Sequence, residues 1–287
     1  MTMAMAKVVA LNVQSFPGPL QRALRLPPSM PRLAAVPGSS AFDDCDLVVF
    51  SEAFSPVARR VLSSALRDRG YVCTSRPTRC CAILNGGVFI CSRQPILYQT
   101  TQAFTAACGT DALAAKGIAF VITNISGTTF GLIGAHLQSG HTEKARRIRR
   151  RQLLQMRSFI DRLSVNVDVM LVAGDLNVEY QSDEYNDMMS ILRATGPIID
   201  PSRAAWRSWD PATNTNAARK CPGQRSWHLD YCFAVEHCNG KTPPAVVNVT
   251  TAFLGEVDGE VQDLSDHHGV TGTLSLQTIP QVESGSS

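Results

Sequence analysis

Short apolar segments rich in β-branched residues recur along this chain, and a single polar residue ends or interrupts many of them. Residues 46–50 (DLVVF) and 168–173 (DVMLVA) have the pattern of buried strands. Glu52 follows the first segment and Asp175 follows the second. A polar side chain beside a buried strand costs free energy unless it has a partner. We therefore expect these side chains to meet in a shared site at the ends of the strands.

The same association of a strand with a polar residue recurs, and the full set is Asn12, Glu52, His136, Asp175, Asn177, Asp230, Asp266 and His267. Carboxylate and amide oxygens are ligands that Mg²⁺ prefers, with Mn²⁺ or Co²⁺ as substitutes. Histidines add acid/base and charge-stabilising roles. A bound metal ion polarises a phosphoryl oxygen and lowers the pKa of a bound water, so no covalent protein nucleophile is needed. The set therefore predicts hydrolysis of a phosphoester.

Helices and strands alternate around these residues. Apolar residues at helical spacing predict helices over 56–70, 142–163 and 183–194. Strand patterns cover 7–13, 87–91, 96–104, 118–125, 129–135, 229–235, 245–253 and 270–276. The strands between 87 and 135 predict a β-meander, and 195–223 is expected to be an ordered loop region. We find no repeat and no linker, which predicts one domain.

Composition constrains the class of protein only weakly. The net charge of +3 is too small to indicate a nucleic-acid-binding protein. The nine cysteines lack the spacing of a zinc site and are expected to be mostly reduced thiols. No signal peptide and no apolar stretch of about 18 residues is visible. The cellular location stays unknown, with a cytoplasmic or peripherally membrane-associated protein favoured.

Four motifs resemble the endonuclease/exonuclease/phosphatase superfamily: Glu52 after an apolar strand, GDLN at 174–177, LDY at 229–231 and SDHH at 265–268. Six further segments are similar to its neutral sphingomyelinase, or sphingomyelinase C, branch. They are GGVFICSRQPI (86–96), KGIAFVI (116–122), GAHLQSG (134–140), GDLNVEY (174–180), EYNDMMSIL (184–192) and SWDPATN (208–214). The resemblance implies a DNase I-like α/β fold, a four-layer α/β/β/α sandwich of two packed mixed β-sheets flanked by helices. It would form a single catalytic domain over 1–276, followed by a polar tail, 277–287, that we expect to be disordered.

The resemblance also implies how a metal ion and a phosphate would be held. Glu52, with Asn12 nearby, would bind the principal Mg²⁺, and Asp266 would lie beside the metal. Asp175 and Asn177 would bind or orient the phosphate and the attacking water. Considered alone, Asn12 can also be a hydrogen-bonded core amide, and Glu52 can be a carboxylate favoured by the start of the following helix.

The resemblance also implies roles for two histidines and for residues of one loop. His136 would stabilise the charge that develops on the phosphorane. His267 would be the general base or a ligand to a second metal, with Asp230 orienting its ring. The neighbouring His268 leaves open which imidazole faces the metal. The residues expected to contact the substrate are Phe54, Trp209, Asp210 and Asn214. The tryptophans of this loop can equally close it over the core.

The expected reaction is cleavage of sphingomyelin or a related choline phospholipid into a lipid alcohol, such as ceramide, and phosphocholine. The expected partner is phospholipid at a membrane surface, and neither a stable protein partner nor nucleic acid is inferred. Residues 253–266 (FLGEVDGEVQDLSD) lack the aromatic hairpin tip of secreted bacterial members. The alternative is a nuclease or phosphatase, which a basic groove around Arg146 to Arg151 would favour. A catalytically inactive binding module is disfavoured because every required polar residue is present.

Overall fold

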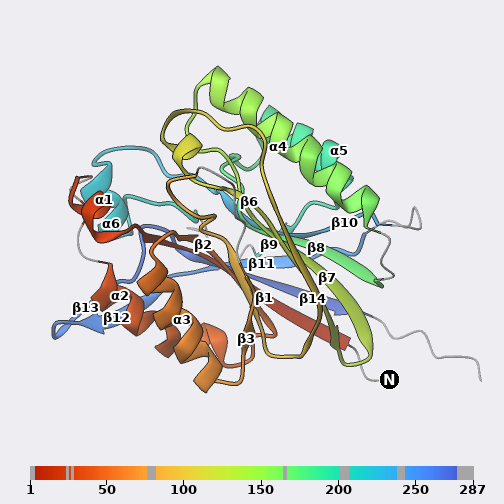
Figure 1. The fold of residues 1–287 in the computed structure, drawn as a ribbon, viewed down its shortest axis with the longest axis horizontal. Coiled ribbons are helices and arrows are strands. Elements are labelled where there is room, and N and C mark those ends of the chain that lie inside the picture. The colour runs from red at the N-terminus through yellow and green to blue at the C-terminus, as the bar shows by residue number, and fades with distance from the viewer. Residues whose placement is uncertain are drawn as a thin grey trace, which may run out of the picture.

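Two β-sheets are stacked face to face, with helices on both outer faces, in the computed structural model (Figure 1). The structure describes residues 4–23, 26, 29–75, 82–163, 167–200, 207–237 and 243–276. One sheet contains, in spatial order, β3 (Val72–Cys73), β4 (Phe89–Ser92), β2 (Leu47–Ala53), β1 (Ala4–Ser15), β14 (Gly269–Leu276), β11 (Val247–Thr251) and β9 (Ile198–Ile199). The other contains β10 (Asp230–Val235), β8 (Val169–Asp175), β7 (Thr128–His136), β6 (Gly117–Ile125) and β5 (Ile96–Ala103).

Both sheets are mixed: β1 pairs parallel to β2, β9 to β11 and β7 to β8, and the other pairs are antiparallel. Helices α2 (Met30–Ala35) and α3 (Pro56–Asp68) cover the seven-stranded sheet, and α4 (Glu143–Arg162) and α5 (Asp183–Leu192) cover the five-stranded sheet (Figure 1). The short helices α1 (Gly18–Ala23) and α6 (Thr215–Lys220) lie together at one end. Three 3-10 turns cover Val36–Gly38, Ser40–Phe42 and Gly109–Leu113. The predicted four-layer sandwich is confirmed.

The side chains of a central strand alternate between two separate hydrophobic cores, one between the sheets and one under the helices. Successive side chains of a strand point to opposite faces of the sheet. In β1, Val8 and Ala10 pack between the two sheets, whereas Val9 and Leu11 pack under α2 and α3. A run of apolar residues in a strand therefore serves two cores at once. This explains why central strands such as β2 and β8 lack a polar face until their ends, where Glu52 and Asp175 lie.

The long helices begin at capping residues. Ser55, Thr142 and Ser182 precede α3, α4 and α5, and each accepts a hydrogen bond from a backbone N–H of the first turn. The buried face of α3 carries Leu62 and Leu66. Burial of one such leucine contributes roughly 1.5–3 kcal/mol. Capping and periodicity together explain why these three helices were predicted from the sequence.

Two expectations about local structure are wrong. The β-meander contains only β5, β6 and β7, because β4 pairs with β2 in the other sheet. The expected loop over 195–223 contains strand β9 and helix α6. The polar tail, 277–287, lies outside the described residues.

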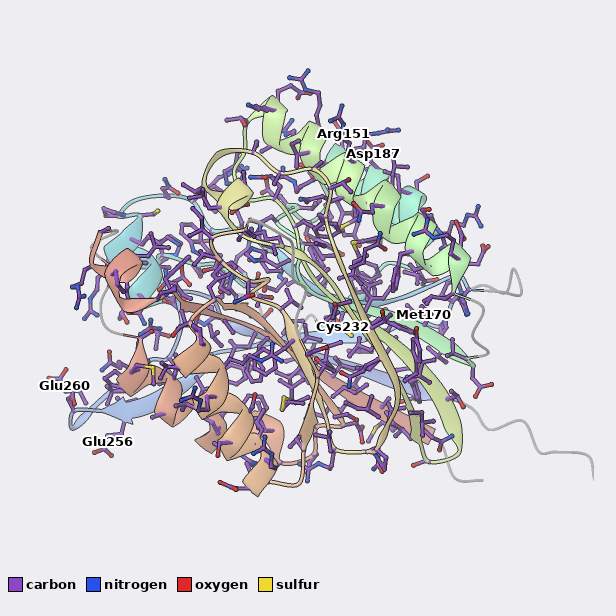
Figure 2. All side chains as sticks on the ribbon, viewed as in Figure 1. Arg151, Met170, Asp187, Cys232, Glu256 and Glu260 are labelled. Carbon is purple, nitrogen blue, oxygen red and sulfur yellow. A yellow bond between two sulfur atoms is a disulfide. The ribbon has the colours of Figure 1, made fainter. Side chains whose placement is uncertain are left out.

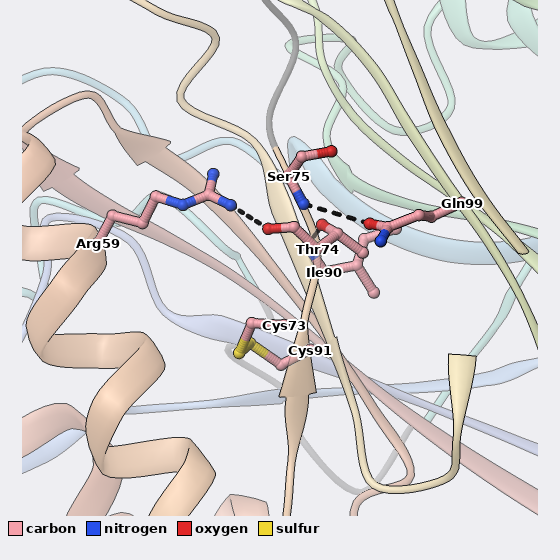
Figure 3. Close-up of a disulfide and its surroundings, with 7 residues drawn as sticks. All are labelled: Arg59, Cys73, Thr74, Ser75, Ile90, Cys91 and Gln99. Carbon is pink, nitrogen blue, oxygen red and sulfur yellow. Dashed lines mark hydrogen bonds between the residues drawn. A yellow bond between two sulfur atoms is a disulfide. The ribbon is translucent and has the colours of Figure 1, made fainter. Parts of the chain in front are cut away.

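One disulfide is present among cysteines that were expected to be mostly reduced thiols. Cys73 and Cys91 are cross-strand partners in β3 and β4, with Cα atoms 4.0 Å apart, and their sulfurs are bonded (Figure 3). Residues next to this bond are also tied together, since Thr74 Oγ1 accepts from the backbone N–H of Ile90. The other described cysteines are free, in agreement with the expectation, and they are Cys45, Cys108, Cys221 and Cys232. Cys80, Cys81 and Cys238 lie outside the described residues.

A β-hairpin precedes the final strand despite the absence of an aromatic tip. It consists of β12 (Leu254–Val257) and β13 (Glu260–Asp263), which pair antiparallel. Figure 2 shows Glu256 and Glu260 projecting from the hairpin at the edge of the molecule. Its exposed apolar residues are Leu254 and Val261, at 53% and 73%. Within the described part of the chain, no helix is both long and apolar enough to cross a membrane.

Candidate active site

Strand register brings the predicted polar residues together at one edge of both sheets. In the five-stranded sheet, His136 pairs with Asp175, and Asp175 pairs with Asp230, so the three form a row across β7, β8 and β10. In the other sheet, Asn12 of β1 lies next to the end of β2, which carries Glu52. Asn12 Nδ2 donates to Asp175 Oδ2 at 2.9 Å and joins the two sheets. The shared site expected from the sequence is therefore formed.

The backbone is strained where it carries these side chains. Gln14, Glu52 and Asn177 have φ values of 43°, 55° and 53°, in the left-handed region that disfavours residues other than glycine. Gly174 has a φ of 133°, and a Cβ at that position would lie 2.1 Å from the backbone oxygen of Ala135. The glycine of the GDLN motif is therefore required by the close approach of β7.

One group of side chains fits a metal ion. Ligand atoms of Glu52, His136 and Asp175 all lie within 4.8 Å of one another. Glu52 Oε2 is buried and has no hydrogen-bond partner among the described residues. A buried carboxylate oxygen without a donor needs a cation or a water. The carboxylates of Glu52 and Asp175 therefore fit Mg²⁺ as ligands. The role of Asn12 as a ligand stays a prediction.

His136 is held by a buried lysine. Lys116 Nζ lies 3.0 Å from His136 Nε2 and 2.8 Å from Asp111 Oδ2. An ammonium group only donates, so Nε2 accepts and the neutral ring carries its proton on Nδ1. Burial, together with the charge of Lys116, lowers the pKa of His136 well below its usual value. The positive charge in this part of the site therefore belongs to Lys116.

Asp175 is the most central carboxylate of the site. Burial and the neighbouring Asp230 raise its pKa to about 7, against the opposing effects of His267 and of the hydrogen bond from Asn12. Its Oδ1 accepts from the backbone N–H of Asn177 at 3.0 Å. Asp175 is thus poised to lose its proton when a cation binds nearby.

Asp230 and His267 form a buried dyad. Asp230 Oδ2 lies 2.8 Å from His267 Nδ1, which fixes the ring and leaves Nε2 free of this bond. Burial lowers the pKa of His267, but Asp230, Asp175 and Asp266 together raise it to about 10. His268 turns away, with Nε2 3.1 Å from Thr213 Oγ1. The geometry therefore selects His267 as the imidazole of the site.

Asp266 is buried and is held by two donors. Its Oδ2 accepts from Gln14 Nε2 at 2.6 Å and from Lys220 Nζ at 3.0 Å. Burial raises the pKa of Asp266, but Lys220 and His267 outweigh this and lower it. Asp266 belongs to neither of the described groups of possible metal ligands, so its position beside a metal stays a prediction.

The four predicted substrate contacts all have partners within the protein. Phe54 is buried and stacks on Phe16, with ring centroids 5.3 Å apart. Trp209 stacks on Trp227 at 4.8 Å. Asn214 caps α6, and Asp210 accepts from Ala212 and Thr213 in the preceding turn and from Ser226, which follows the helix. Contact of these residues with a substrate stays a prediction.

Several residues of the site were not assigned from the sequence. Lys116 lies in the quoted segment KGIAFVI, and Gln14 directly follows the strand predicted over 7–13, but neither was given a role. Lys220 carries no signal in the sequence, because only tertiary structure brings it to Asp266, 46 residues away. Asp111 lies five residues before Lys116, but no motif drew attention to it. The available hint for Lys116 was its position as the charged first residue of an otherwise apolar motif.

The basic residues 144–151 face acidic side chains. Arg149 is buried and donates to both carboxylate oxygens of Glu184, at 2.6 and 2.8 Å. A groove between α4 and α5 is lined by the arginines 146, 147 and 150 and by the acids 183, 184 and 187. Figure 2 shows Arg151 and Asp187 in this outer layer. Much of the basic charge is therefore balanced by α5.

A second cavity, of about 380 Å³, extends from Arg146 to Asn177.

Residues 9–267 match the sequence profile described as the Endonuclease/Exonuclease/phosphatase family. The chain belongs to this family. The match begins in β1 and ends at His267, so it includes all the residues of the site from Asn12 to the dyad.

Within the Endonuclease/Exonuclease/phosphatase family, the resemblance to the sphingomyelinase C branch is also supported. A protein of Listeria ivanovii named Sphingomyelinase C is 29% identical over 254 residues, covering 79% of this chain and 74% of that protein. One of Leptospira interrogans with the same name is 30% identical over 279 residues, covering 88% of this chain and 49% of that protein. The chain therefore spans about half the length of the second relative.

Crystal structures of beta toxin from Staphylococcus aureus show the same fold. One is 27% identical, with a TM-score of 0.81, and covers 93% of this chain and 99% of the toxin chain. A second, with bound magnesium ions, is 24% identical, with a TM-score of 0.80 and coverage of 94% and 99%. These likenesses confirm the expected fold of the family.

Proposed function

We propose that this protein is a metal-dependent phosphodiesterase of phospholipase C type. It would hydrolyse sphingomyelin, or a related choline phospholipid, to a lipid alcohol such as ceramide and phosphocholine. One observation carries the proposal: Asp175 Oδ2 lies 3.5 Å from His136 Nε2 and 3.9 Å from His267 Nε2. A candidate metal cluster and a candidate general base thus share one carboxylate. The relatives named Sphingomyelinase C support the choice of substrate.

Mg²⁺ is the proposed cofactor, with Mn²⁺ or Co²⁺ as substitutes. Glu52 and Asp175 would hold it, with Asn12 keeping Asp175 in place through the 2.9 Å hydrogen bond. When bound, the ion would polarise a phosphoryl oxygen and acidify a water molecule. The magnesium ions in one beta toxin structure point to the same cofactor.

The protein side chains would supply proton transfer and orientation. A bound cation would oppose the positive charge on the ring and lower the pKa of His267 from its metal-free value of about 10, so that the neutral ring would accept a proton at Nε2 from the attacking water. Asp230 holds Nδ1 at 2.8 Å and would stabilise the imidazolium that forms. Asn177 would orient the phosphate from its strained turn after β8. Lys116 donates to Asp111, to His136 and to the backbone oxygen of Leu137, so its role would be to hold His136 in place rather than to contact the phosphate.

The partner we infer is phospholipid at a membrane surface, which the protein would reach as a peripheral protein. We also infer that residues 1–276 act as a single catalytic domain. The alternative, a nuclease or phosphatase, would use the same site. No feature of the site favours it specifically, because the arginines of α4 that would form its basic groove face the acidic residues of α5.

Hydrolysis assays on three substrates test the proposal. Vesicles of sphingomyelin, micelles of lysophospholipid and plasmid DNA are incubated with the protein and Mg²⁺, and again with excess chelator. We expect release of phosphocholine from sphingomyelin that stops in chelator. Release that continues in chelator would refute the metal mechanism. Nicking of DNA without lipid cleavage would refute the choice of substrate.

A further inference from the structure

Lys220 enters the site on the last turn of α6. The helix is fixed to the segment before the Asp-His motif, since Asn214 Nδ2 donates to the backbone oxygen of Ser265 at 3.0 Å. Thr215 contributes a second anchor through two 2.8 Å hydrogen bonds to Asp263 Oδ2. These contacts place the end of α6 beside Asp266, so that Lys220 reaches the buried carboxylate from outside.

The carboxylate that Lys220 meets is surrounded by protein donors. Asp266 has a side-chain exposure of 1%, and its Oδ2 accepts from both Gln14 and Lys220. Arg32 is also buried near it and donates through Nη1 to the backbone oxygen of Leu264 at 2.7 Å. The negative charge of Asp266 is therefore already balanced by groups of the protein itself.

The ammonium group of Lys220 has N–H donors beyond the one that this ion pair occupies. It carries three N–H donors, and its one described hydrogen-bond acceptor is Asp266. Its side chain is 40% exposed, against 1% for Asp266. Burial raises the pKa of Glu52, and Lys220 is the strongest of the charges that oppose this shift. Lys220 thus pairs with the buried Asp266, lies close enough to Glu52 to affect its charge, and has N–H donors that no described residue uses.

We propose that Lys220 is a phosphate-binding residue of this active site. It neutralises Asp266, so that Asp266 provides no ligand to a metal ion, and it donates a charge-assisted hydrogen bond to an anionic oxygen of the substrate phosphate. The inference rests on the proposed function for the identity of the substrate, but binding of phosphate itself can be measured separately. A purely structural ion pair would anchor α6 and leave phosphate affinity unchanged.

Binding measurements separate these roles. Mg²⁺ and then inorganic phosphate are titrated calorimetrically into the wild type, Lys220→Met, Lys220→Arg and the matched control Arg219→Met, which removes the neighbouring exposed charge of the same helix. We expect Lys220→Met to weaken phosphate binding about tenfold or more, as loss of a charge-assisted hydrogen bond does. Lys220→Arg and Arg219→Met should stay within about threefold of the wild type. Lys220 and Mg²⁺ are both positively charged and repel each other. Removal of the lysine charge in Lys220→Met should therefore leave the affinity for Mg²⁺ equal or higher.

Two results would contradict a role of Lys220 in phosphate binding. Phosphate affinity of Lys220→Met within twofold of the wild type, with the variant folded by circular dichroism, would overturn the proposal. So would loss of a Mg²⁺ binding event in Asp266→Asn. If the wild type releases no phosphocholine from sphingomyelin but its phosphate affinity depends on Lys220, the proposed function fails and this inference stands. If it releases phosphocholine and Lys220→Met binds phosphate normally, only this inference fails.

Discussion

Replacement of Asp230 by asparagine tests the dyad, because it keeps the shape of the side chain and removes its charge. Asp230 is fully buried, and its Oδ2 lies 2.8 Å from His267 Nδ1. Loss of the orienting carboxylate should lower kcat by about 10²–10⁴, the range for positioned general acid–base catalysis and its supporting carboxylate. We expect KM to change by less than about threefold. The assay is release of phosphocholine from sphingomyelin vesicles at saturating Mg²⁺.

The same substitution has an expected effect on stability that depends on pH. In the metal-free protein the pKa of His267 is raised from 6.5 to about 10. A group with a raised folded-state pKa contributes stability that is fully present below about pH 6.5 and is lost as pH rises through about 10. The charge-assisted hydrogen bond is worth about 1.5–3 kcal/mol. Asp230→Asn should therefore lower the free energy of unfolding by about 2 kcal/mol at pH 6 and by much less at pH 10.5.

Asp46→Asn is the matched control, because Asp46 precedes β2 at the end remote from Glu52 and accepts from the backbone N–H of Lys7 at 2.9 Å. It should leave kcat unchanged. A kcat for Asp230→Asn within about fivefold of the wild type would refute the assignment of the dyad. An equal loss of stability at both pH values, measured by chemical denaturation in chelator, would refute the charged state of His267.

Three further outcomes are expected. Glu52→Gln should weaken Mg²⁺ binding at least tenfold by calorimetry, because it removes the charge of the carboxylate whose Oε2 lacks a donor; unchanged affinity would place the metal elsewhere. Gly174→Ala should destabilise the protein by about 3 kcal/mol or more, since its Cβ would lie 2.1 Å from the oxygen of Ala135; a thermal midpoint within 1 °C, about 0.5 kcal/mol at most, would contradict the described turn. Mg²⁺ affinity should fall as pH decreases through about 7, because Asp175 must lose its proton; calorimetry in buffers of different ionisation enthalpy should detect proton release at pH 6, and its absence would assign Asp175 another role.

The sequence allowed prediction of the parts of the fold that local patterns encode. The three long helices have capping residues and periodic apolar faces, and both are visible without a structure. The row of His136, Asp175 and Asp230 was expected as a shared site, because each residue lies at the end of an apolar strand. The roles within that site came from the resemblance to a family, since spacing alone does not say which carboxylate faces a metal.

The remaining features depend on tertiary contacts that no local pattern reports. Strand β4 has the same composition as its neighbours, and its membership of the other sheet follows only from pairing with β2. Cys73 and Cys91 are 18 residues apart and meet through strand register. Lys220 lies in a polar segment expected to be a loop, and its contact with Asp266 spans 46 residues.

The position of bond cleavage tests the central claim most directly. Sphingomyelin in vesicles is hydrolysed by the protein with Mg²⁺ in water enriched in oxygen-18, and the masses of both products are measured by mass spectrometry. Attack of water on phosphorus, with His267 accepting its proton, should place one labelled oxygen in phosphocholine and none in ceramide, and no product should form in chelator. Label in ceramide, or unlabelled phosphocholine, would contradict the proposed reaction.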